Sequence, residues 1–312
     1  SVTSAVKASL KGGTKYYFTL IAKYSDGTYY LYPTEFVTTT SYKEIFDKGA
    51  EVWNKWKANN PEIGVLDLTN FPSGYFSYKT FEGYNLVAVK LRAGNLSRVK
   101  FINCNFTGSF FTSGSFVQTK FYSCKIGGAD FSQVTNLSRT SFYQSELSYL
   151  NFYGKNLSMV NFSEAKLTSV SFSNATLYKA KFIKATLMKG NFGNANLEAA
   201  DFSSAKIENA FNLKTAKITS ATIFKRTGFY NADFSGNNLS DCNFSQTVFY
   251  KTNFTKAILH RTNFINANFD FANFTGASLY QANFRYSIII RTNFTDASLF
   301  HADLGIVSLV YD

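Results

Sequence analysis

Residues 272–286 decide the fold, because they divide into three five-residue units, A-N-F-T-G, A-S-L-Y-Q and A-N-F-R-Y. Each unit begins with alanine, and its third residue is large and apolar: Phe274, Leu279 and Phe284. A period of five matches neither the 3.6-residue repeat of an α-helix nor the two-residue repeat of a flat strand. It predicts a chain that turns a corner every five residues and directs one large and one small side chain inward on each side.

The same period extends over most of the 312 residues. Large apolar residues recur at every fifth position within four blocks, 66–131, 137–207, 213–223 and 229–309. These blocks contain forty-nine such positions, of which 26 are Phe and 23 are Leu or Ile. One extra residue separates each block from the next, near Val134, near Phe211 and near residues 226–228. We expect each shift to be a single-residue bulge at a corner, with the frame resuming at once.

The alternation of Phe and Leu in the second block, as in Phe142, Leu147, Phe152 and Leu157, indicates a square cross-section. Opposite sides then carry matching side chains, and four sides of five residues make a coil of twenty. The units of residues 272–286 resemble the pentapeptide-repeat family. That resemblance implies an all-β fold, a right-handed quadrilateral parallel β-helix. About twelve coils at a strand spacing of about 4.8 Å make a rod roughly 60 Å long.

Residues 1–62 lack the repeat and are predicted to form a small α+β domain, with the β-helix over 63–312. Strand-like segments at residues 15–24 and 28–32 flank Asp26-Gly27, a two-residue hairpin turn signal. Residues 35–39 are expected to add a third strand to this hairpin. Ser41 and Glu44 make a capping box that predicts a helix ending before Pro61.

This helix carries one apolar stripe, formed by Tyr42, Ile45, Phe46, Gly49, Trp53 and Trp56. Two roles are open for the N-terminal unit. It can cover the first coil, whose exposed edge otherwise invites aggregation. Alternatively, it can dock onto a partner through the aromatic face of its strands, which carries Tyr16, Phe18, Tyr29 and Tyr32.

The chain has 32 basic and 20 acidic residues, a formal net charge of +12. Such an excess favours acidic partners, or it serves only to keep the protein soluble. No run of five basic residues occurs, so nucleic acid is a disfavoured partner. The N-terminus has no apolar stretch of signal-peptide length, and no 18 consecutive residues are apolar. We therefore expect no membrane span, and a protein that is cytoplasmic or assembled into a particle.

The residues give no indication of catalysis, and we predict no enzyme activity, cofactor or metal. The only histidines, His260 and His301, are expected to point outward about two coils apart, too distant to share a metal. Cys104, Cys124 and Cys242 all fall on the small inward position. Buried free thiols are favoured over a disulfide in a protein without secretion signals.

Residues twenty apart stack along one side, so outward columns can be read from the sequence. The side centred on Phe229, Phe249 and Phe269 predicts a protein-contact stripe with an aromatic and apolar character. The same stacking can serve only to stabilise the sheet. The candidate residues are Tyr230, Val248, Tyr250, Lys251, Phe271, Ile288, Ile290, Arg291 and Tyr311.

The last coil is apolar, with Leu304, Ile306, Leu309 and Val310 close to the final residue and no helix to cover them. Some pentapeptide-repeat proteins dimerise through their last coils. The resemblance therefore implies a homodimer at this end, with two-fold symmetry.

We expect a non-enzymatic scaffold that presents β-helix faces to a protein partner or a larger assembly. The alternative is a structural component of a virus particle or surface assembly, which suits a stiff rod with low charge and abundant Asn, Ser and Thr. The family also includes acidic members that resemble B-form DNA and bind gyrase. That function is disfavoured, because a DNA mimic needs negative columns and this chain has outward Lys179, Lys184, Lys189, Lys251, Lys256 and Arg261.

Overall fold

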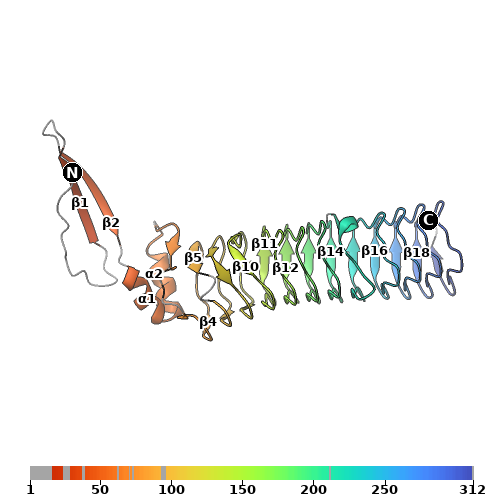
Figure 1. Ribbon diagram of the computed structural model, residues 1–312, viewed down its shortest axis with the longest axis horizontal. Coiled ribbons are helices and arrows are strands. Elements are labelled where there is room, and N and C mark those ends of the chain that lie inside the picture. Colours follow the sequence, from red (N-terminus) through yellow and green to blue (C-terminus); the bar gives the residue numbers. More distant parts are fainter. Residues whose placement is uncertain are drawn as a thin grey trace.

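The computed structural model describes residues 16–23, 29–36, 39–61, 63–69, 71, 74–92, 96–210 and 212–310. Within these ranges it describes the side chains from residue 42 onward, apart from that of Val310. Figure 1 shows a long rod of stacked coils with two helices at its N-terminal end and a hairpin beyond them.

The rod is a right-handed quadrilateral parallel β-helix of about 12 coils, as the repeat predicts. One of its sides is a parallel sheet of nine strands in sequence order. The register Glu146↔Lys166↔Thr186 advances by one 20-residue coil per strand. The strands are β11 (Glu146–Ser148), β12 (Lys166–Thr168), β13 (Thr186–Met188), β14 (Lys206–Glu208), β15 (Gly228–Tyr230), β16 (Val248–Tyr250), β17 (Asn268–Asp270), β18 (Ile288–Ile290) and β19 (Ser308–Val310).

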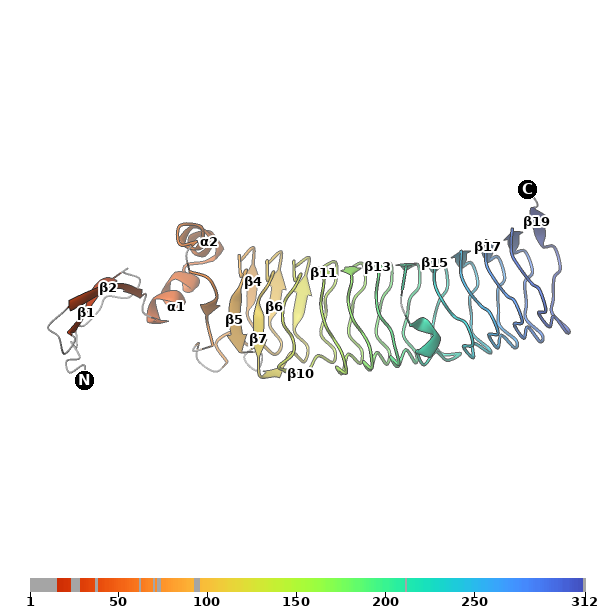
Figure 2. The same ribbon diagram turned by 90° about the horizontal axis from the view of Figure 1, so that it is seen from above.

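The first coils have three shorter parallel sheets, ordered β3-β5-β7, β4-β6-β9 and β10-β8. Their strands are β3 (Leu66–Asp67), β4 (Thr80–Glu82), β5 (Val89–Arg92), β6 (Lys100–Ile102), β7 (Phe110–Thr112), β8 (Gly114–Ser115), β9 (Lys120–Tyr122) and β10 (Val134–Asn136). Sides without named strands are joined by single bridges such as Asn253↔Asn273. The view from above shows these coils in one continuous stack (Figure 2).

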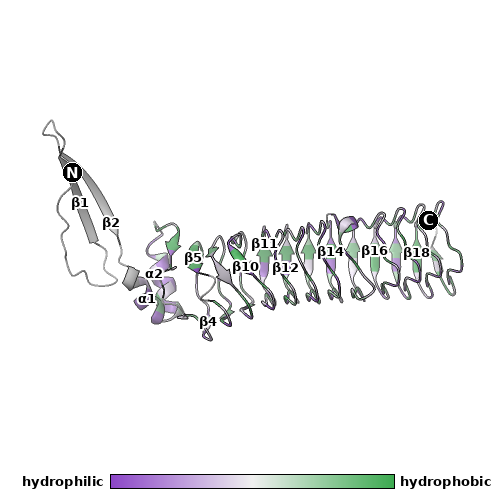
Figure 3. Ribbon diagram, in the orientation of Figure 1, coloured by the Kyte–Doolittle hydropathy of each residue, from purple (hydrophilic) through white to green (hydrophobic). Residues whose placement is uncertain are grey.

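The core is the column of large residues that the period predicts. Of the forty-nine positions, all are buried except Ile223, Phe294, Leu299, Leu304 and Leu309. Phenylalanine rings stack from coil to coil, with 4.7 Å between the ring centres of Phe254 and Phe274. Figure 3 shows the result as apolar residues that recur in every coil between polar ones.

Polar atoms near the core are paired in a repeating way. An inward hydroxyl donates to a carbonyl of the preceding coil, as Thr262 Oγ1 does to Leu239 O at 3.0 Å. The Asn before a large residue accepts a hydrogen bond from a backbone N–H two places on, as Asn273 Oδ1 does from Thr275 N at 3.0 Å. The small and polar residues that recur with the period therefore supply hydrogen bonds to the backbone, whose buried polar groups need partners.

At most corners, the residue two places after the large one has a left-handed backbone, as in Lys184 (φ 56) and Lys189 (φ 55). This geometry directs corner side chains outward in columns along the rod. Ile306 (φ 57) is the one β-branched residue with positive φ in the described part of the chain. A β-branched side chain is disfavoured in this conformation, so the corner at Ile306 is strained.

Two of the three frame shifts lie near the predicted places. At the first, β10 pairs with β8 through a register shift between Val134 and Asn136. At the second, Asn212 has a left-handed backbone and is followed by a short 3-10 helix, η2 (Leu213–Thr215), rather than a simple bulge.

The position that the sequence predicts for the third frame shift is wrong. Ile223, predicted to point inward, is 43% exposed, whereas the neighbouring Phe224 is 1% exposed. The inward step from Ile218 therefore ends at Phe224, and the extra residue lies at 219–221 instead of 226–228. Because Ile and Phe are adjacent here, either frame satisfies the apolar pattern.

The N-terminal hairpin pairs β1 (Tyr16–Lys23) with β2 (Tyr29–Phe36) in antiparallel register, from Tyr16↔Phe36 to Lys23↔Tyr29. Its turn at Asp26-Gly27 and the side chains of its aromatic face lie outside the described residues. The third strand predicted over 35–39 is wrong, because β2 continues to Phe36 and a helix begins at Thr39.

The predicted single helix is two helices, α1 (Thr39–Asp47) and α2 (Ala50–Ala58). Gly49 separates them with φ 96 and ψ 174, a backbone geometry that glycine adopts readily. The apolar stripe runs through both helices without interruption, so Gly49 is the one sign of the break in the sequence.

The two helices lie against the first coils of the rod. Phe46 and Trp53 are buried, and the Phe46 ring centre lies 4.5 Å from that of Tyr84 and 5.4 Å from that of Phe81. Ile45 is buried too, and Trp56 packs against the same core at its margin. These side chains cover the apolar end that the first coil otherwise exposes.

Helix α2 also pairs with the backbone of the first coil. Trp53 Nε1 donates to Asn85 O at 2.7 Å, and Asn54 Nδ2 donates to Gly83 O at 2.9 Å. Asn85 N in turn donates to Asn54 Oδ1 at 2.7 Å. Side chains of α2 therefore form hydrogen bonds with backbone groups of the first coil that would otherwise have no neighbouring strand to pair with.

Candidate functional site

The predicted contact stripe lies on the outer face of the nine-stranded sheet, over β15 to β18. Val248, Phe271 and Ile288 are exposed large apolar residues there. Tyr230, Tyr250 and Ile290 lie beside them, half-buried. Tyr311 lies outside the described residues. The remaining members thus share one face, as the 20-residue spacing predicts.

Aromatic rings and cations form a continuous ladder along this stripe. The ring centres of Tyr230 and Tyr250 are 6.4 Å apart, and those of Tyr250 and Phe271 are 6.2 Å apart. Lys251 Nζ lies 5.3 Å from the Tyr250 ring centre and 5.8 Å from that of Phe271. Such cation–π contacts hold the lysine over the rings.

Arg291 ends the ladder. Its guanidinium carbon lies 4.0 Å from the Phe271 ring centre, and its NH2 lies 2.9 Å from Asp270 Oδ1. The guanidinium is thus stacked and paired with a carboxylate. The two basic residues of the stripe are therefore ordered by their neighbours and do not form an open cationic patch.

The earlier half of the same face has a different character. Lys166 pairs with Glu146 at 3.3 Å, and Lys206 pairs with Glu208 at 2.9 Å. Exposed ion pairs of this kind contribute little to binding or stability. Exposed apolar side chains in this half are isolated, as at Tyr149 and Met188, whereas from Tyr230 onward they contact one another from coil to coil.

At the C-terminal end, the inward positions Leu304 and Leu309 are exposed, because the described part of the chain places nothing over the last coil. Ile306, at its strained corner, is 70% exposed. The side chain of Val310 lies outside the described residues. The described residues thus leave an apolar layer exposed at the C-terminal coil.

An aromatic column on another side was missed by the sequence reasoning. His260, Tyr280 and Phe300 are twenty residues apart, with ring centres separated by 5.9 and 6.0 Å. The His301 ring centre lies 4.1 Å from that of Phe300. The histidines thus belong to a ladder of rings. The 20-residue spacing of His260, Tyr280 and Phe300 could have predicted this column.

Several titratable groups on the rod are paired between neighbouring coils. Hydrogen bonds from the Arg261 guanidinium, at 2.7 and 2.8 Å, lower the pKa of the Asp241 carboxyl below its usual range. Burial raises the pKa of the Cys242 thiol to about 12. Cys104, Cys124 and Cys242 are buried and free. Among the described residues, no three His, Cys, Asp or Glu residues are grouped so that they could hold a metal.

The family model for pentapeptide repeats matches eight copies in this chain, over residues 95–133, 156–194, 229–265, 262–299 and 277–305. The chain is a pentapeptide-repeat protein. Proteins of this family are generally non-enzymatic structural scaffolds. No curated protein matches the chain.

Several solved pentapeptide-repeat structures are similar to this pentapeptide-repeat chain. HetL, involved in heterocyst differentiation regulation in the cyanobacterium Nostoc sp. strain PCC 7120, is 17% identical (81% of this chain, 93% of HetL, TM-score 0.35). The plasmid-mediated fluoroquinolone resistance protein QnrB1 is 17% identical, and the match covers 74% of this chain and 91% of QnrB1 with a TM-score of 0.36. Rfr23 of the cyanobacterium Cyanothece 51142 is 21% identical, and the match covers 54% of this chain and 91% of Rfr23 with a TM-score of 0.15.

Of the helices in the described ranges, none has the length and apolar character needed to span a bilayer.

Proposed function

We propose that this pentapeptide-repeat chain is a non-enzymatic interaction scaffold that presents the contact stripe to a protein partner. The observation that supports this most is the exposure of Val248, Phe271 and Ile288 beside a ladder of ordered Tyr, Lys and Arg side chains. Aromatic and arginine side chains on an apolar surface are the residue types that contribute most to protein interfaces.

The rigidity of the sheet favours this function. The stripe residues stand on strands paired with the neighbouring coils, as Tyr250 is with Tyr230 and Asp270, or at the corners that directly follow these strands. Binding then orders few additional side chains and no backbone, so little conformational entropy is lost. A stiff rod also suits the alternative, a structural component of a virus particle or surface assembly, in which the stripe makes a lateral contact.

Gyrase binding by mimicry of DNA remains the less favoured function, because the net charge is +12 and the stripe carries cations instead of rows of carboxylates. Direct binding of nucleic acid is also disfavoured, because Arg291 and Arg261 are already paired with Asp270 and Asp241.

A matched pair of variants tests the stripe. Ile288 (40% exposed) and Ile258 (39% exposed) both precede a large inward residue, but only Ile288 belongs to the stripe. In affinity capture with cross-linking, we expect Ile288→Ser to lose a specific partner that both the wild type and Ile258→Ser retain. Equal recovery with both variants contradicts the proposal. Recovery of the wild type within a larger particle supports the structural alternative.

We also propose that residues 1–62 form a unit that caps the rod through α1 and α2. Support comes from the burial of Phe46 and Trp53 and from the bonds of Trp53 and Asn54 to the first coil. Deleting residues 1–60 tests this role. Aggregation of the remaining rod supports a cap, whereas a soluble rod that has lost its partner supports docking through this unit.

A second candidate contact is self-association through the C-terminal coil. The exposure of Leu304, Ile306 and Leu309 in the C-terminal coil supports a two-fold dimer there. Such a contact leaves the stripe on the side of the rod available to a different partner.

A further inference from the structure

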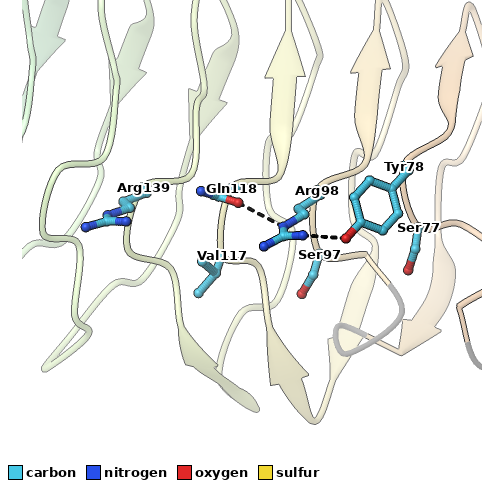
Figure 4. Close-up of a pocket in the computed structure, with 7 residues that line it drawn as sticks. All are labelled: Ser77, Tyr78, Ser97, Arg98, Val117, Gln118 and Arg139. Atoms are coloured by element: carbon cyan, nitrogen blue, oxygen red, sulfur yellow. Dashed lines mark hydrogen bonds between the residues drawn. The ribbon is translucent and has the colours of Figure 1, made fainter.

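A groove lies on the side of the rod that carries the column Tyr78, Arg98, Gln118 and Arg139. Its volume is about 470 Å³, and its lining is completed by Ser77, Ser97 and Val117. Figure 4 shows these side chains side by side along the rod. They come from the first four coils and do not belong to the contact stripe.

The corner geometry explains why these side chains line up. All four column residues have a left-handed backbone, with φ between 58 and 63, and all four are exposed. They are spaced by 20, 20 and 21 residues, and the last step includes the bulge near Val134. The bulge therefore keeps Arg139 in register with Arg98 and Gln118.

Neighbouring side chains hold Arg98 in place. Its Nε donates to Gln118 Oε1 at 3.0 Å, and its NH1 donates to the Tyr78 hydroxyl. Its guanidinium carbon also lies 5.4 Å from the Tyr78 ring centre. Because the amide oxygen of Gln118 accepts from Arg98, its amide nitrogen points along the groove toward Arg139 (Figure 4).

The groove thus offers hydrogen-bond donors and positive charge. The free donors are the remaining NH2 of Arg98, the Gln118 amide nitrogen and the Arg139 guanidinium, which has no bonded partner in the described part of the chain. None of the described lining residues is Asp or Glu. A planar guanidinium fork matches the oxygens of a phosphate, and here one such fork is already ordered.

We propose that this groove binds a phosphate monoester carried by a small organic molecule. The donor set recognises the phosphate oxygens between Arg98 and Arg139. A volume of about 470 Å³ has room for more than one oxyanion and falls in the range of small-molecule sites. Val117 and the Tyr78 ring supply apolar surface for the organic part.

The chain contains its own control. Arg226 Nε donates to Gln246 Oε1 at 2.8 Å, which repeats the Arg98–Gln118 pair at another corner column. The following corner residue in that column is Asn266, and the preceding one is Ser204, so no tyrosine and no second arginine complete a groove. Arg226→Gln changes the net charge as Arg139→Gln does, without touching the proposed site.

Titration calorimetry of the full chain with phenyl phosphate, inorganic phosphate and phenol tests the proposal. We expect phenyl phosphate to bind one-to-one with a Kd below about 1 mM, and at least about tenfold tighter than either of the other two, because both the donors and the apolar surface are used. Arg139→Gln should weaken binding about tenfold or more, Arg139→Lys should recover part of the loss, and Arg226→Gln should have no effect.

Circular dichroism checks that each variant is folded, as expected for substitutions of exposed corner residues. Absence of saturable binding to the wild type overturns the proposal. So does equal affinity for phenyl phosphate and inorganic phosphate, or an equal loss in Arg139→Gln and Arg226→Gln, which indicates attraction by net charge alone.

Discussion

Arg291 and Phe271 lie on adjacent coils, and the guanidinium of Arg291 covers the Phe271 ring at 4.0 Å from its centre. An exposed aromatic residue and an exposed cation thereby become one ordered surface element. Their contact is local enough to be measured without knowledge of a partner.

A double-mutant cycle with Phe271→Leu and Arg291→Gln should give a coupling of about 0.5–1 kcal/mol in urea unfolding, the usual range for an exposed cation–π pair. Phe271→Leu combined with the distant Arg226→Gln serves as control and should be additive. Additivity in the first cycle contradicts the ladder.

The inward and outward assignment predicts opposite results for two neighbouring residues. Phe172 is buried, with ring centres 5.8 Å from Phe152 and 5.2 Å from Phe192. Phe172→Ala should reduce the free energy of unfolding by about 3–5 kcal/mol, because it leaves a cavity in the stack. Ser173→Ala should change it by less than about 0.5 kcal/mol. Equal losses in denaturant melts are incompatible with this fold.

The N-terminal cover predicts a graded effect at Trp53. Trp53→Phe removes the donor to Asn85 O and should cost about 1–3 kcal/mol, whereas Trp53→Ala also leaves a cavity and should cost about 3–5 kcal/mol. Trp56→Phe is the control, because the Trp56 indole N–H has no partner in the described part of the chain. If thermal melts show no loss for Trp53→Ala, the helices do not stabilise the first coil.

Self-association should depend on Ile306. Ile306→Asn removes an exposed apolar side chain, and Asn tolerates the left-handed corner, so the monomer should stay folded. Sedimentation velocity should show a dimer for the wild type and a monomer for this variant. Met159→Asn makes a similar change at an exposed corner in the middle of the rod and should remain dimeric. A wild type that stays monomeric rules out the end-to-end contact.

The three cysteines should resist alkylation in the native protein. A free thiol becomes mostly thiolate between about pH 8 and pH 10, and the thiolate is the reactive form. Since burial raises the pKa of Cys242 to about 12, this thiol stays protonated over that range. Iodoacetamide followed by mass spectrometry should label none of the thiols before denaturation and all three after it. Native labelling that rises with pH at Cys242 contradicts its buried position.

Most of the fold could be predicted from the sequence because one period sets both the burial and the hydrogen bonds. The prediction failed where two frames satisfy the period equally, at Ile223 and Phe224. It also failed at Gly49, where the break in the helix is a matter of backbone geometry and not of polarity. At Leu304 and Leu309 the period is correct, but burial also requires a following coil.

The surfaces were only partly predictable, because a column is defined by the number of residues per coil. The stripe at Tyr230 and Tyr250 was found by counting in twenties. The groove at Arg98 and Arg139 was not, since an inserted residue near Val134 makes its last step 21. Contacts such as that of Arg291 with Asp270 depend on side-chain conformation, which periodicity does not determine.

The constant register between coils has a consequence for how such a chain can change in length. Removing twenty consecutive residues, as from Phe254 to Asn273, brings Asn253 against Phe274 in the same frame and shortens the rod by one strand spacing, about 4.8 Å. Every remaining column then stays aligned. Removing nineteen residues instead would shift each later residue by one position, so that the columns no longer match. Gain or loss of whole coils therefore changes the distance between two binding surfaces while leaving their relative orientation nearly unchanged.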